Sequence, residues 1–421
     1  MTSRFTPDGG ESVDFVIDAE TLSRHIDILG EIGNEDGKLF RPVYTPQWKR
    51  AQVQLRDWMD EIGLKTREDP VGNIFGRLDG SCSDAVVLTG SHFDTVRNGG
   101  RFDGALGIHS AIAAADAIIR SKKRPGRAIE IVAFAEEEGS RFALSMLGSR
   151  SLVGLLDYET VGQQLDIDGV TLSEAMATVG LDASQIHSAR RDDLGYFLEL
   201  HIEQGEILEE EGLDIGVVTA ITGQLMVEVT VKGKQNHAGT TPMRLRRDAL
   251  VAASEMILAI EQIGTVGEAS VGTVGQLQLS PGSTNVIPGI VRFTIDARSP
   301  ALAELHDMDQ QIHQKLMEIA TRREVTVSFS EHYFDEPVPM NSELASLIED
   351  QVKQHGYRSR RIPSGAGHDS QIIAASIPTA MIFTPSEGGI SHSPAENTPI
   401  EEILPATAVL ASTLWALSHK P

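Results

Sequence analysis

The stretch AIEIVAFAEEEG, residues 128–139, decides which fold the sequence predicts. Its first eight residues are mostly apolar or β-branched, which is typical of a strand covered on both faces, and three glutamates follow directly. A similar strand, AVVLTGS, is predicted at residues 85–91, and an Ala/Ile-rich helical stretch at residues 105–120 lies between the two. Strands and helices that alternate in this way indicate an α/β domain with a mainly parallel sheet.

A third strand, YFLELHIE, is predicted at residues 196–203, and the pattern then changes. Residues 221–333 predict strand, helix, strand, strand, helix and strand, and both VEVTV (227–231) and VRFTI (291–295) alternate with period two. That alternation suits a sheet covered on one face only. We therefore predict that this block is an inserted α+β domain with a ferredoxin-like order of elements.

The α/β pattern returns after the insert, with a helix at residues 342–355, the strand TAMIF at residues 379–383 and a closing helix near residues 407–418. The fold class is therefore predicted as α/β. Its discontinuous catalytic domain comprises residues 1–220 and 334–421, with a mixed sheet and helices on both faces. A chain of 421 residues is also longer than one hydrophobic core usually organises.

The composition excludes several classes of function. A net charge of -24 argues against nucleic-acid binding, which needs clustered Lys and Arg. No segment approaches the roughly eighteen unbroken apolar residues that cross a membrane, and the start, MTSRFTPDGGESVD, has no apolar core of a secretory signal. The single Cys82 forms no internal disulfide. We expect a cytoplasmic protein that acts on a small molecule.

Acidic and histidine side chains follow the predicted strands where each strand ends. Binding sites of open α/β sheets form at the carboxyl ends of the strands, and three adjacent glutamates there repel one another unless a cation is bound. Taken singly, these residues have ordinary structural explanations: an exposed acidic turn, or a strand-end histidine with a satisfied hydrogen bond. The candidates are His92, Asp94, Asp103, Glu136, Glu137, Glu138, His201, and His392 in a Gly/Ser/Pro loop.

Five of these side chains together predict a metal centre. Mixed imidazole and carboxylate ligands suit zinc, manganese or cobalt. A single catalytic zinc usually takes three protein ligands, so five ligands with one shared carboxylate fit two divalent ions better than one. The five are His92, Asp103, Glu138, His201 and His392.

Nine short motifs carry a family resemblance. In the order of the chain they are HFD, GGRFDG, AEEEG, LHIEQG, NHAGTTPM, STNVIPG, IDAR, SGAGHD and GGISHSPAE. From about residue 41 to the C-terminus, the sequence resembles the zinc-dependent amidohydrolases that include N-carbamoyl-L-amino-acid hydrolases, β-ureidopropionase and allantoate amidohydrolase. These enzymes belong to the dinuclear metallohydrolase superfamily of aminoacylases and carboxypeptidases. HIEQG and NHAGTTPM distinguish this branch from its peptidase relatives.

The resemblance implies a role for each residue of the metal centre. Asp103 would bridge two ions, and Glu137 would act as the general base that takes a proton from a water and returns it to the leaving nitrogen. Asp94 would accept the second imidazole N–H of His92 and so fix its tautomer. The other ligands would be His92 and His201 for one ion, and Glu138 and His392 for the other.

The resemblance also implies that the inserted domain is a lid that contacts substrate and joins two subunits into a homodimer. His237 in NHAGTTPM would hold the developing oxyanion, and Arg298 in IDAR would hold a substrate carboxylate. Without the family, Arg298 would be a strand-end arginine with a surface partner. Part of each site would come from the neighbouring subunit. Further substrate contacts would be Asn285, Gln204, Gly365 and His368.

The motifs leave the substrate open. EPVPMN (336–341) resembles allantoate amidohydrolase, whereas MLGSR (146–150) and PSEGGISHSP (385–394) resemble the carbamoyl-amino-acid hydrolases. REDPVGNIFGR and ILEEEGLDIGVVTAI resemble plant ureidoglycolate amidohydrolase, which lacks the NHAGTTPM threonines found here. We predict cleavage of the ureido C–N bond of N-carbamoyl-L-amino acids, with release of ammonia and carbon dioxide. Allantoate is the nearest alternative, before ureidoglycolate and N-carbamoyl-β-alanine.

Two alternatives come from other classes. A metallo-aminoacylase or dipeptidase of the same superfamily would share the metals but not HIEQG and NHAGTTPM. A non-catalytic binding protein on this fold would have lost ligands or Glu137, and the sequence retains all of them.

Overall fold

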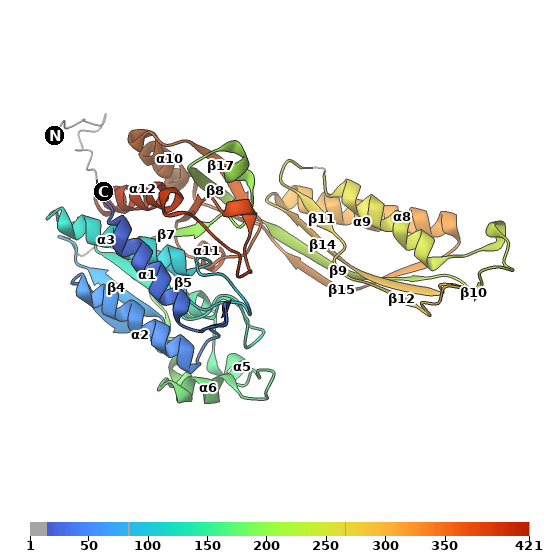
Figure 1. Ribbon diagram of the computed structural model, residues 1–421, viewed down its shortest axis with the longest axis horizontal. Helices are drawn as coiled ribbons and strands as arrows, with labels where there is room; N and C mark the ends of the chain where they lie inside the picture. The colour runs from blue at the N-terminus through green and yellow to red at the C-terminus, as the bar shows by residue number, and fades with distance from the viewer. Residues whose placement is uncertain (1–14, 83–84, 266, 421) are drawn as a thin grey trace. The chain divides into compact units, whose positions relative to one another are not determined.

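The protein is described by a computed structural model that covers residues 15–82, 85–265 and 267–420 (Figure 1). It divides into two compact units. The first unit comprises Met1–Thr219, Met340–Ile362 and His368–Pro421, and the second comprises Ala220–Pro339 and Pro363–Gly367. The N-terminal residues 1–14, on which the cytoplasmic prediction partly relied, lie outside the described residues.

A mixed sheet forms the centre of the first unit. Its four middle strands are parallel and lie in the spatial order β18, β7, β5 and β6. They span Thr379–Thr384, Leu194–Ile202, Val86–His92 and Ile129–Phe134. Antiparallel strands extend the sheet beyond β6 and β18: β4 (Ile74–Leu78), β3 (Lys65–Glu68) and β8 (Ile215–Ile221), with β16 (Val338–Pro339) and β17 (Ser359–Ser364) paired to β8.

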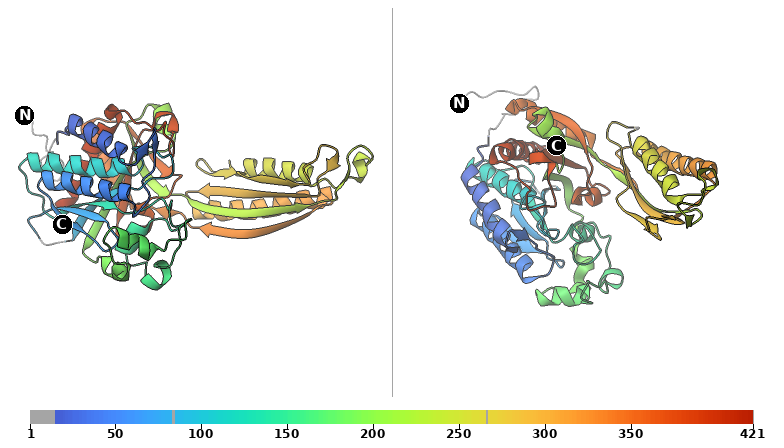
Figure 2. Two further views of the ribbon diagram at one scale, coloured as in Figure 1. Left: turned by 60° about the horizontal axis from the view of Figure 1, so that its bottom comes forward. Right: turned by 45° about the vertical axis from the view of Figure 1, so that its right-hand side comes forward.

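Helices cover both faces of this sheet (Figure 2). Successive side chains of β7 point to opposite faces of the sheet. Leu198 and Leu200 pack into one core cluster, with a first set of helices, and Phe197 packs into another cluster on the opposite face. The first set is α1 (Ala19–Glu31), α3 (Ala105–Arg120), α10 (Ser342–His355) and α12 (Ile400–Ser418). Short helices α4 (Leu147–Leu152) and α11 (Asp369–Ile373) supply residues to the second cluster. The other helices are α2 (Pro46–Glu61), α5 (Tyr158–Val161), α6 (Leu172–Thr178) and α7 (Ile207–Glu211), and a small hairpin joins β1 (Asn34–Glu35) to β2 (Lys38–Leu39).

The closing helix differs from the prediction. It begins at Ile400 and not near residue 407, and it contains Pro405. Proline usually marks a helix start or break, so the sequence pattern placed the start after it, although the structure continues the helix through it. This helix is long and apolar enough to cross a membrane by composition alone, but much of it is buried within the first unit. It is therefore explained as a core helix.

An antiparallel sheet and two helices form the second unit. The long strands β9 (Gly223–Lys232), β14 (Ile290–Ser299) and β15 (Thr326–Asp335) pair in the order β14, β9, β15, and the short strands β11 (Val271–Thr273) and β12 (Leu277–Ser280) pair with β14. Alternate residues of β9 and β14 pack against α8 (Ala249–Ile263) and α9 (Leu302–Arg323). A separate pair joins β10 (Asn236–His237) to β13 (Val286–Ile287).

The predicted mixed α/β fold, with helices packed on a mixed sheet, is confirmed. The boundaries of the two units differ from the predicted domains, because β15 runs to Asp335 beside β9, and residues 334–339 and 363–367 group with the second unit. The roles of that unit as a lid and as a dimerisation domain stay predictions.

Candidate metal centre

Three of the candidate side chains come from the carboxyl ends of neighbouring parallel strands. His92 is the last residue of β5, His201 is the penultimate residue of β7, and Glu137 follows the end of β6. Asp103 lies just before α3, in a turn completed by Gly104. Gly104 has a φ of 67°, and a Cβ there would overlap the His92 ring, so the turn needs glycine.

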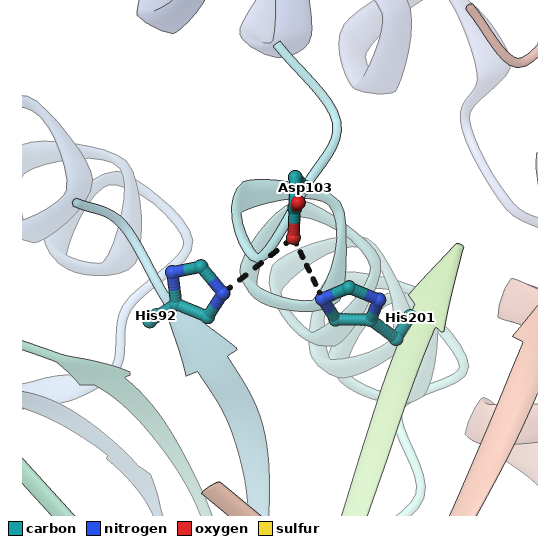
Figure 3. Close-up of side chains that lie close together, drawn as sticks. All are labelled: His92, Asp103 and His201. Carbon is teal, nitrogen blue, oxygen red and sulfur yellow. Dashed lines mark ion pairs between the residues drawn. The ribbon is translucent and has the colours of Figure 1, made fainter. Parts of the chain in front are cut away.

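Asp103 lies between two groups of side chains. Its Oδ1 is 3.1 Å from His201 Nε2 and 3.7 Å from His92 Nε2 (Figure 3). Its Oδ2 is 3.1 Å from His392 Nε2, and that nitrogen is 3.7 Å from Glu138 Oε2. In each group, the atoms that could bind a metal lie within 4.8 Å of one another. The two oxygens of one carboxylate therefore face two different sets of donors.

The other nitrogen of each buried histidine is held by a second contact. His201 Nδ1 is 2.9 Å from the Ile202 carbonyl, to which it donates. His92 Nδ1 is 3.3 Å from Asp94 Oδ1. These contacts hold each ring through Nδ1 and direct Nε2 towards Asp103, and a ring that carries its proton on Nδ1 presents Nε2 as a metal ligand. Asp94 also accepts the main-chain N–H groups of Glu137 (3.0 Å) and Glu138 (3.2 Å).

A third overlapping group contains His92, Glu137 and Glu138, so the crowding extends beyond the two sets around Asp103. Burial raises the pKa of Glu137 well above its ordinary value; His92 opposes this rise and Glu138 adds to it. Burial also raises the pKa of Glu138 to about 7, and Asp103 is the next largest cause. A cation among these carboxylates would relieve their mutual repulsion.

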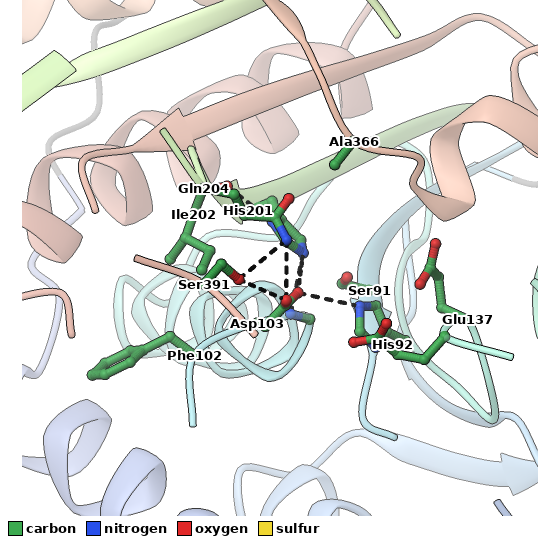
Figure 4. A network of polar contacts seen from close by, with 12 residues as sticks. Ser91, His92, Phe102, Asp103, Glu137, His201, Ile202, Gln204, Ala366 and Ser391 are labelled. Atoms are coloured by element: carbon green, nitrogen blue, oxygen red, sulfur yellow. Dashed lines mark hydrogen bonds and ion pairs between the residues drawn. The ribbon is translucent and has the colours of Figure 1, made fainter. Parts of the chain in front are cut away.

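Gln204 and Ser391 surround the second oxygen of Asp103 (Figure 4). Gln204 Nε2 donates to Asp103 Oδ2 at 3.0 Å, and Ser391 Oγ is 2.9 Å from the same oxygen. Gln204 and His392 both have left-handed backbones, with φ of 59° and 53°. Such conformations are uncommon outside glycine and concentrate at functional sites. His368, another predicted contact, is buried, with its ring centroid 4.5 Å from that of His201.

His237 and Asn285 are neighbours within the second unit. Strand β10 pairs with β13, and the Asn285 carbonyl accepts the N–H of Ala238 at 2.9 Å. Both side chains are exposed. His237 Nδ1 accepts the N–H groups of Gly239 (3.0 Å) and Thr240 (3.2 Å), so the ring carries its proton on Nε2 and that N–H remains available as a donor.

Arg298 and Gly365 also lie together in the second unit. Arg298 Nε and Nη2 donate to the two carboxylate oxygens of Asp296 at 3.0 and 2.9 Å, and Nη1 donates to the Gly365 carbonyl at 2.7 Å. Gln224 Nε2 also donates to Asp296 Oδ2, at 2.9 Å. The guanidinium is therefore fixed in direction, with one N–H of each terminal nitrogen left for a ligand.

Two carboxylates that were not predicted from the sequence join these segments. Glu199 is buried below His201, and it accepts from Ser91 Oγ at 2.8 Å and from the N–H and Oγ of Ser370 at 3.0 and 2.7 Å. Glu396 accepts the N–H of Asp103 at 3.0 Å. Glu199 belongs to the predicted strand YFLELHIE and Glu396 to the motif GGISHSPAE, so both lie in segments whose sequence had already indicated a site.

Comparison with known proteins assigns this arrangement to a family. The profile of peptidase family M20/M25/M40 matches residues 88–416. Allantoate amidohydrolase of Escherichia coli (strain K12) is 41% identical over 384 residues, which cover 91% of this chain and 93% of that protein. The N-carbamoyl-L-amino acid amidohydrolase of Geobacillus stearothermophilus is 40% identical over 409 residues, covering 96% of this chain and 100% of that protein. A crystal structure of an amidase of the hydantoinase/carbamoylase family from Burkholderia multivorans superposes with a TM-score of 0.92, at 34% identity over 97% of this chain and 99% of that one.

The chain belongs to peptidase family M20/M25/M40, whose members are metal-dependent hydrolases. Within that family it is one of the amidohydrolases, which act on carbon–nitrogen bonds other than peptide bonds. The predicted resemblance is thereby confirmed, and the cluster around Asp103 supplies donors suited to a metal.

Proposed function

We propose that this chain hydrolyses the ureido C–N bond of N-carbamoyl-L-amino acids with two divalent ions. The donor set suits zinc, manganese or cobalt. The observation that carries the metal part is the orientation of Asp103, whose oxygens face different donor sets. One ion would be held by Asp103, His92 and His201. The other would be held by Asp103, Glu138 and His392.

Ions held in this way, when bound, provide a water of lowered pKa and polarise the carbonyl that is attacked. Glu137 would take the proton from that water and deliver it to the leaving nitrogen. The main-chain N–H of Glu137 donates a hydrogen bond to Asp94, and the Glu137 carboxylate accepts no hydrogen bond from the described residues. The amino acid is then released, and the carbamate breaks down to ammonia and carbon dioxide.

The second unit would supply the substrate contacts. The free Nε2–H of His237 suits an oxygen on which negative charge develops, and Asn285 lies beside it. The two remaining terminal N–H groups of Arg298 suit a carboxylate, and Gly365 would be a further contact. Gln204 and His368, which belong to the first unit, are also proposed as contacts. A substrate with both a ureido group and a carboxylate matches this combination.

We also infer a homodimer formed through the second unit. Arg298 lies eight residues along β14 from Ile290, which is about 26 Å at the rise of a strand, and His237 pairs with Val286 beyond that end. One copy of the second unit therefore does not bring both side chains to one small substrate. The edge strand β12 exposes Leu277 and Leu279, an apolar surface suited to a second copy.

The cytoplasm is the proposed location, and a chain whose single cysteine, Cys82, has no second cysteine for an internal disulfide is consistent with it. Allantoate remains the second candidate substrate, because it also carries a carboxylate next to ureido groups and the relatives include enzymes named for both substrates.

A substrate panel tests the proposal. Purified enzyme loaded with zinc or manganese would be assayed on N-carbamoyl amino acids, allantoate, ureidoglycolate and N-carbamoyl-β-alanine, with ammonia and the amine product both measured. The highest kcat/KM should be for an N-carbamoyl-L-amino acid. A higher kcat/KM for allantoate would replace the proposed substrate, and a preference for dipeptides or N-acetyl amino acids would reject the ureido class.

Metal analysis tests the two-ion part separately. The active protein should contain two ions per chain, and Asp103→Ala should lose both the metal and the activity, because each ion depends on that carboxylate. One ion per chain at full activity would contradict the proposal.

A further inference from the structure

Glu396 connects the loop that carries His392 to the turn that carries Asp103. Its side chain is 5% exposed. Oε1 accepts the main-chain N–H of Phe102 at 2.8 Å and that of Asp103 at 3.0 Å. Hydrogen bonds from main-chain amides to an ionised carboxylate are strong, so the turn before α3 is held at Glu396.

Gly100 shows how closely the carboxylate fits this turn. A Cβ on Gly100 would overlap the carboxylate carbon and Oε1 of Glu396. The backbone must therefore lack a side chain at residue 100 for Glu396 to reach the two N–H groups. The contact is a close fit of main chain against carboxylate and not an incidental approach.

The second oxygen of Glu396 reaches the other side of the centre. Oε2 is 3.0 Å from Ser391 Oγ, which is itself 2.9 Å from Asp103 Oδ2. Ser391 immediately precedes His392, whose Nε2 is 3.1 Å from the same Asp103 oxygen (Figure 4 draws Ser391 beside Asp103). One carboxylate thus contacts the main chain of Asp103 and the residue next to His392.

We propose that Glu396 is a positioning residue of the metal centre, which sets the separation between Asp103 and His392. This inference rests on the proposed function, because these two residues are the proposed ligands that share one ion. Glu396 touches neither reacting atoms nor substrate in this account. It acts through the two ligands, in the way that outer hydrogen-bond partners hold ligands in metal sites.

Support of the fold alone is the competing explanation, and Asp166 provides the matched control. Its Oδ1 also accepts two main-chain N–H groups, from Asp168 at 3.0 Å and Val170 at 2.9 Å, and its Oδ2 accepts from Arg141 at 3.0 Å. None of these partners is a proposed metal ligand. Removing either carboxylate deprives two amides of their acceptor, but only Glu396 lies next to the centre.

The test measures metal binding by calorimetric titration of the metal-free full-length protein with zinc and manganese, alongside thermal unfolding. Glu396→Ala should weaken binding of one of the two ions by about tenfold to a hundredfold. Glu396→Gln should restore most of the affinity, because its amide oxygen still accepts both N–H groups. Asp166→Ala should lower the unfolding temperature without weakening metal binding.

Gly100→Ala supplies an independent variant, because its methyl group displaces the carboxylate without removing it. Gly100→Ala should weaken binding of the same ion as Glu396→Ala does. Combining the two changes should weaken binding little further, because the carboxylate that the methyl group displaces is then absent. If Glu396→Ala fails to fold, Glu396→Asp replaces it in the test. The shorter side chain should weaken binding of the ion without unfolding the protein.

Unchanged binding of both ions in Glu396→Asp and Gly100→Ala would overturn the inference, as would an equal loss of affinity in Asp166→Ala. Weakened binding without rescue by Glu396→Gln would also overturn it, because geometry would then not be the cause. The metal-binding measurements do not depend on turnover. A protein that shows the expected losses of metal affinity but hydrolyses no ureido acid would reject the proposed substrate and leave the positioning role intact.

Discussion

The two units hold their candidate functional side chains in opposite ways. In the first unit, His92, Asp103 and His201 are buried, and hydrogen bonds fix the direction of each histidine ring. In the second unit, His237 and Asn285 are exposed at the β10–β13 pair. The difference teaches that three of the five proposed metal ligands are held by the interior of one unit, whereas the proposed lid contacts His237 and Asn285 lie on a surface that needs a further element to enclose a ligand.

The largest expected effect is in the buried half of this comparison. Glu137→Gln should lower kcat by about a hundredfold to ten-thousandfold, the usual contribution of a general base, and should retain both ions. Glu138→Gln should also weaken metal binding, because its carboxylate faces His392. Steady-state kinetics and metal content of both variants check this. Equal metal loss in the two would show that Glu137 is itself a ligand, as its place in the third donor group allows.

The next effect concerns Arg298. Replacement by Lys keeps a charge but loses the planar fork and the bonds to Asp296, so kcat/KM on an N-carbamoyl amino acid should fall by about tenfold to a hundredfold. On the neutral amide of the same substrate, wild type and Arg298→Lys should differ little. A loss of equal size on both substrates would mean that Arg298 supports the second unit and does not bind a carboxylate.

Mixing two inactive variants tests whether the exposed half is completed by a second chain. After subunit exchange, Glu137→Gln and His237→Ala should recover about a quarter of wild-type activity, because half of the dimers are mixed and each of these has one intact site. Activity is measured after exchange has been verified by mass. Absence of recovery would indicate sites built from one chain.

The smallest effect concerns the cost of burial in the first unit. Both ring nitrogens of His109 are buried without a hydrogen-bond partner among the described residues. Burial lowers its pKa from 6.5 to about 3, and His25 and Arg41 add to the shift. The unfolded chain takes up this proton near pH 6.5 but the folded chain does not, so folding stability falls as the pH decreases from 6.5 towards 3 and is unaffected above 6.5.

The free energy of unfolding of His109→Leu should therefore be compared with that of wild type at pH 7 and at pH 5. The difference between the two proteins should shift in favour of the variant by about 2 kcal/mol at the lower pH. Urea unfolding at the two pH values measures the gain. His187→Leu is the control, because it makes the same replacement at an exposed histidine. A pH dependence that is identical in wild type and His109→Leu would assign the acid sensitivity to other groups.

The long elements could be predicted from the sequence because their periodicity is strong. Helices α3 and α10 begin at the predicted residues, and the parallel strands lie within two residues of the predictions. The edge strand β3 was missed, because its four residues, KTRE, are all polar and show no apolar alternation. Strand β8, an apolar run that lies between β18 and β16, was missed as well. Pro405 moved the predicted start of α12, because the local cost of a proline was outweighed by the packing of the rest of the helix.

The donor types of the site could also be predicted, because acids and histidines at strand ends are visible in the sequence. Which oxygen of Asp103 faces which histidine could not, since that depends on the turn at Gly104. The pairing of Arg298 with Asp296 was also missed, although the two residues are adjacent on one face of β14. The period-two alternation of β14 predicts that Arg298 and Asp296 share a face of the strand. The second partner of Arg298, the Gly365 carbonyl, could not be predicted, because only the tertiary fold brings residue 365 to it.

The discontinuity of the first unit has a consequence for how the centre is assembled. During synthesis the chain emerges from the N-terminus, so His92, Asp103 and His201 are all made before the second unit, and His392 is made after it. A nascent chain paused at the end of the second unit would hold every proposed donor for one ion, while the other ion would still lack its histidine. Metal uptake would then have a built-in order, in which the ion shared by His92 and His201 enters first.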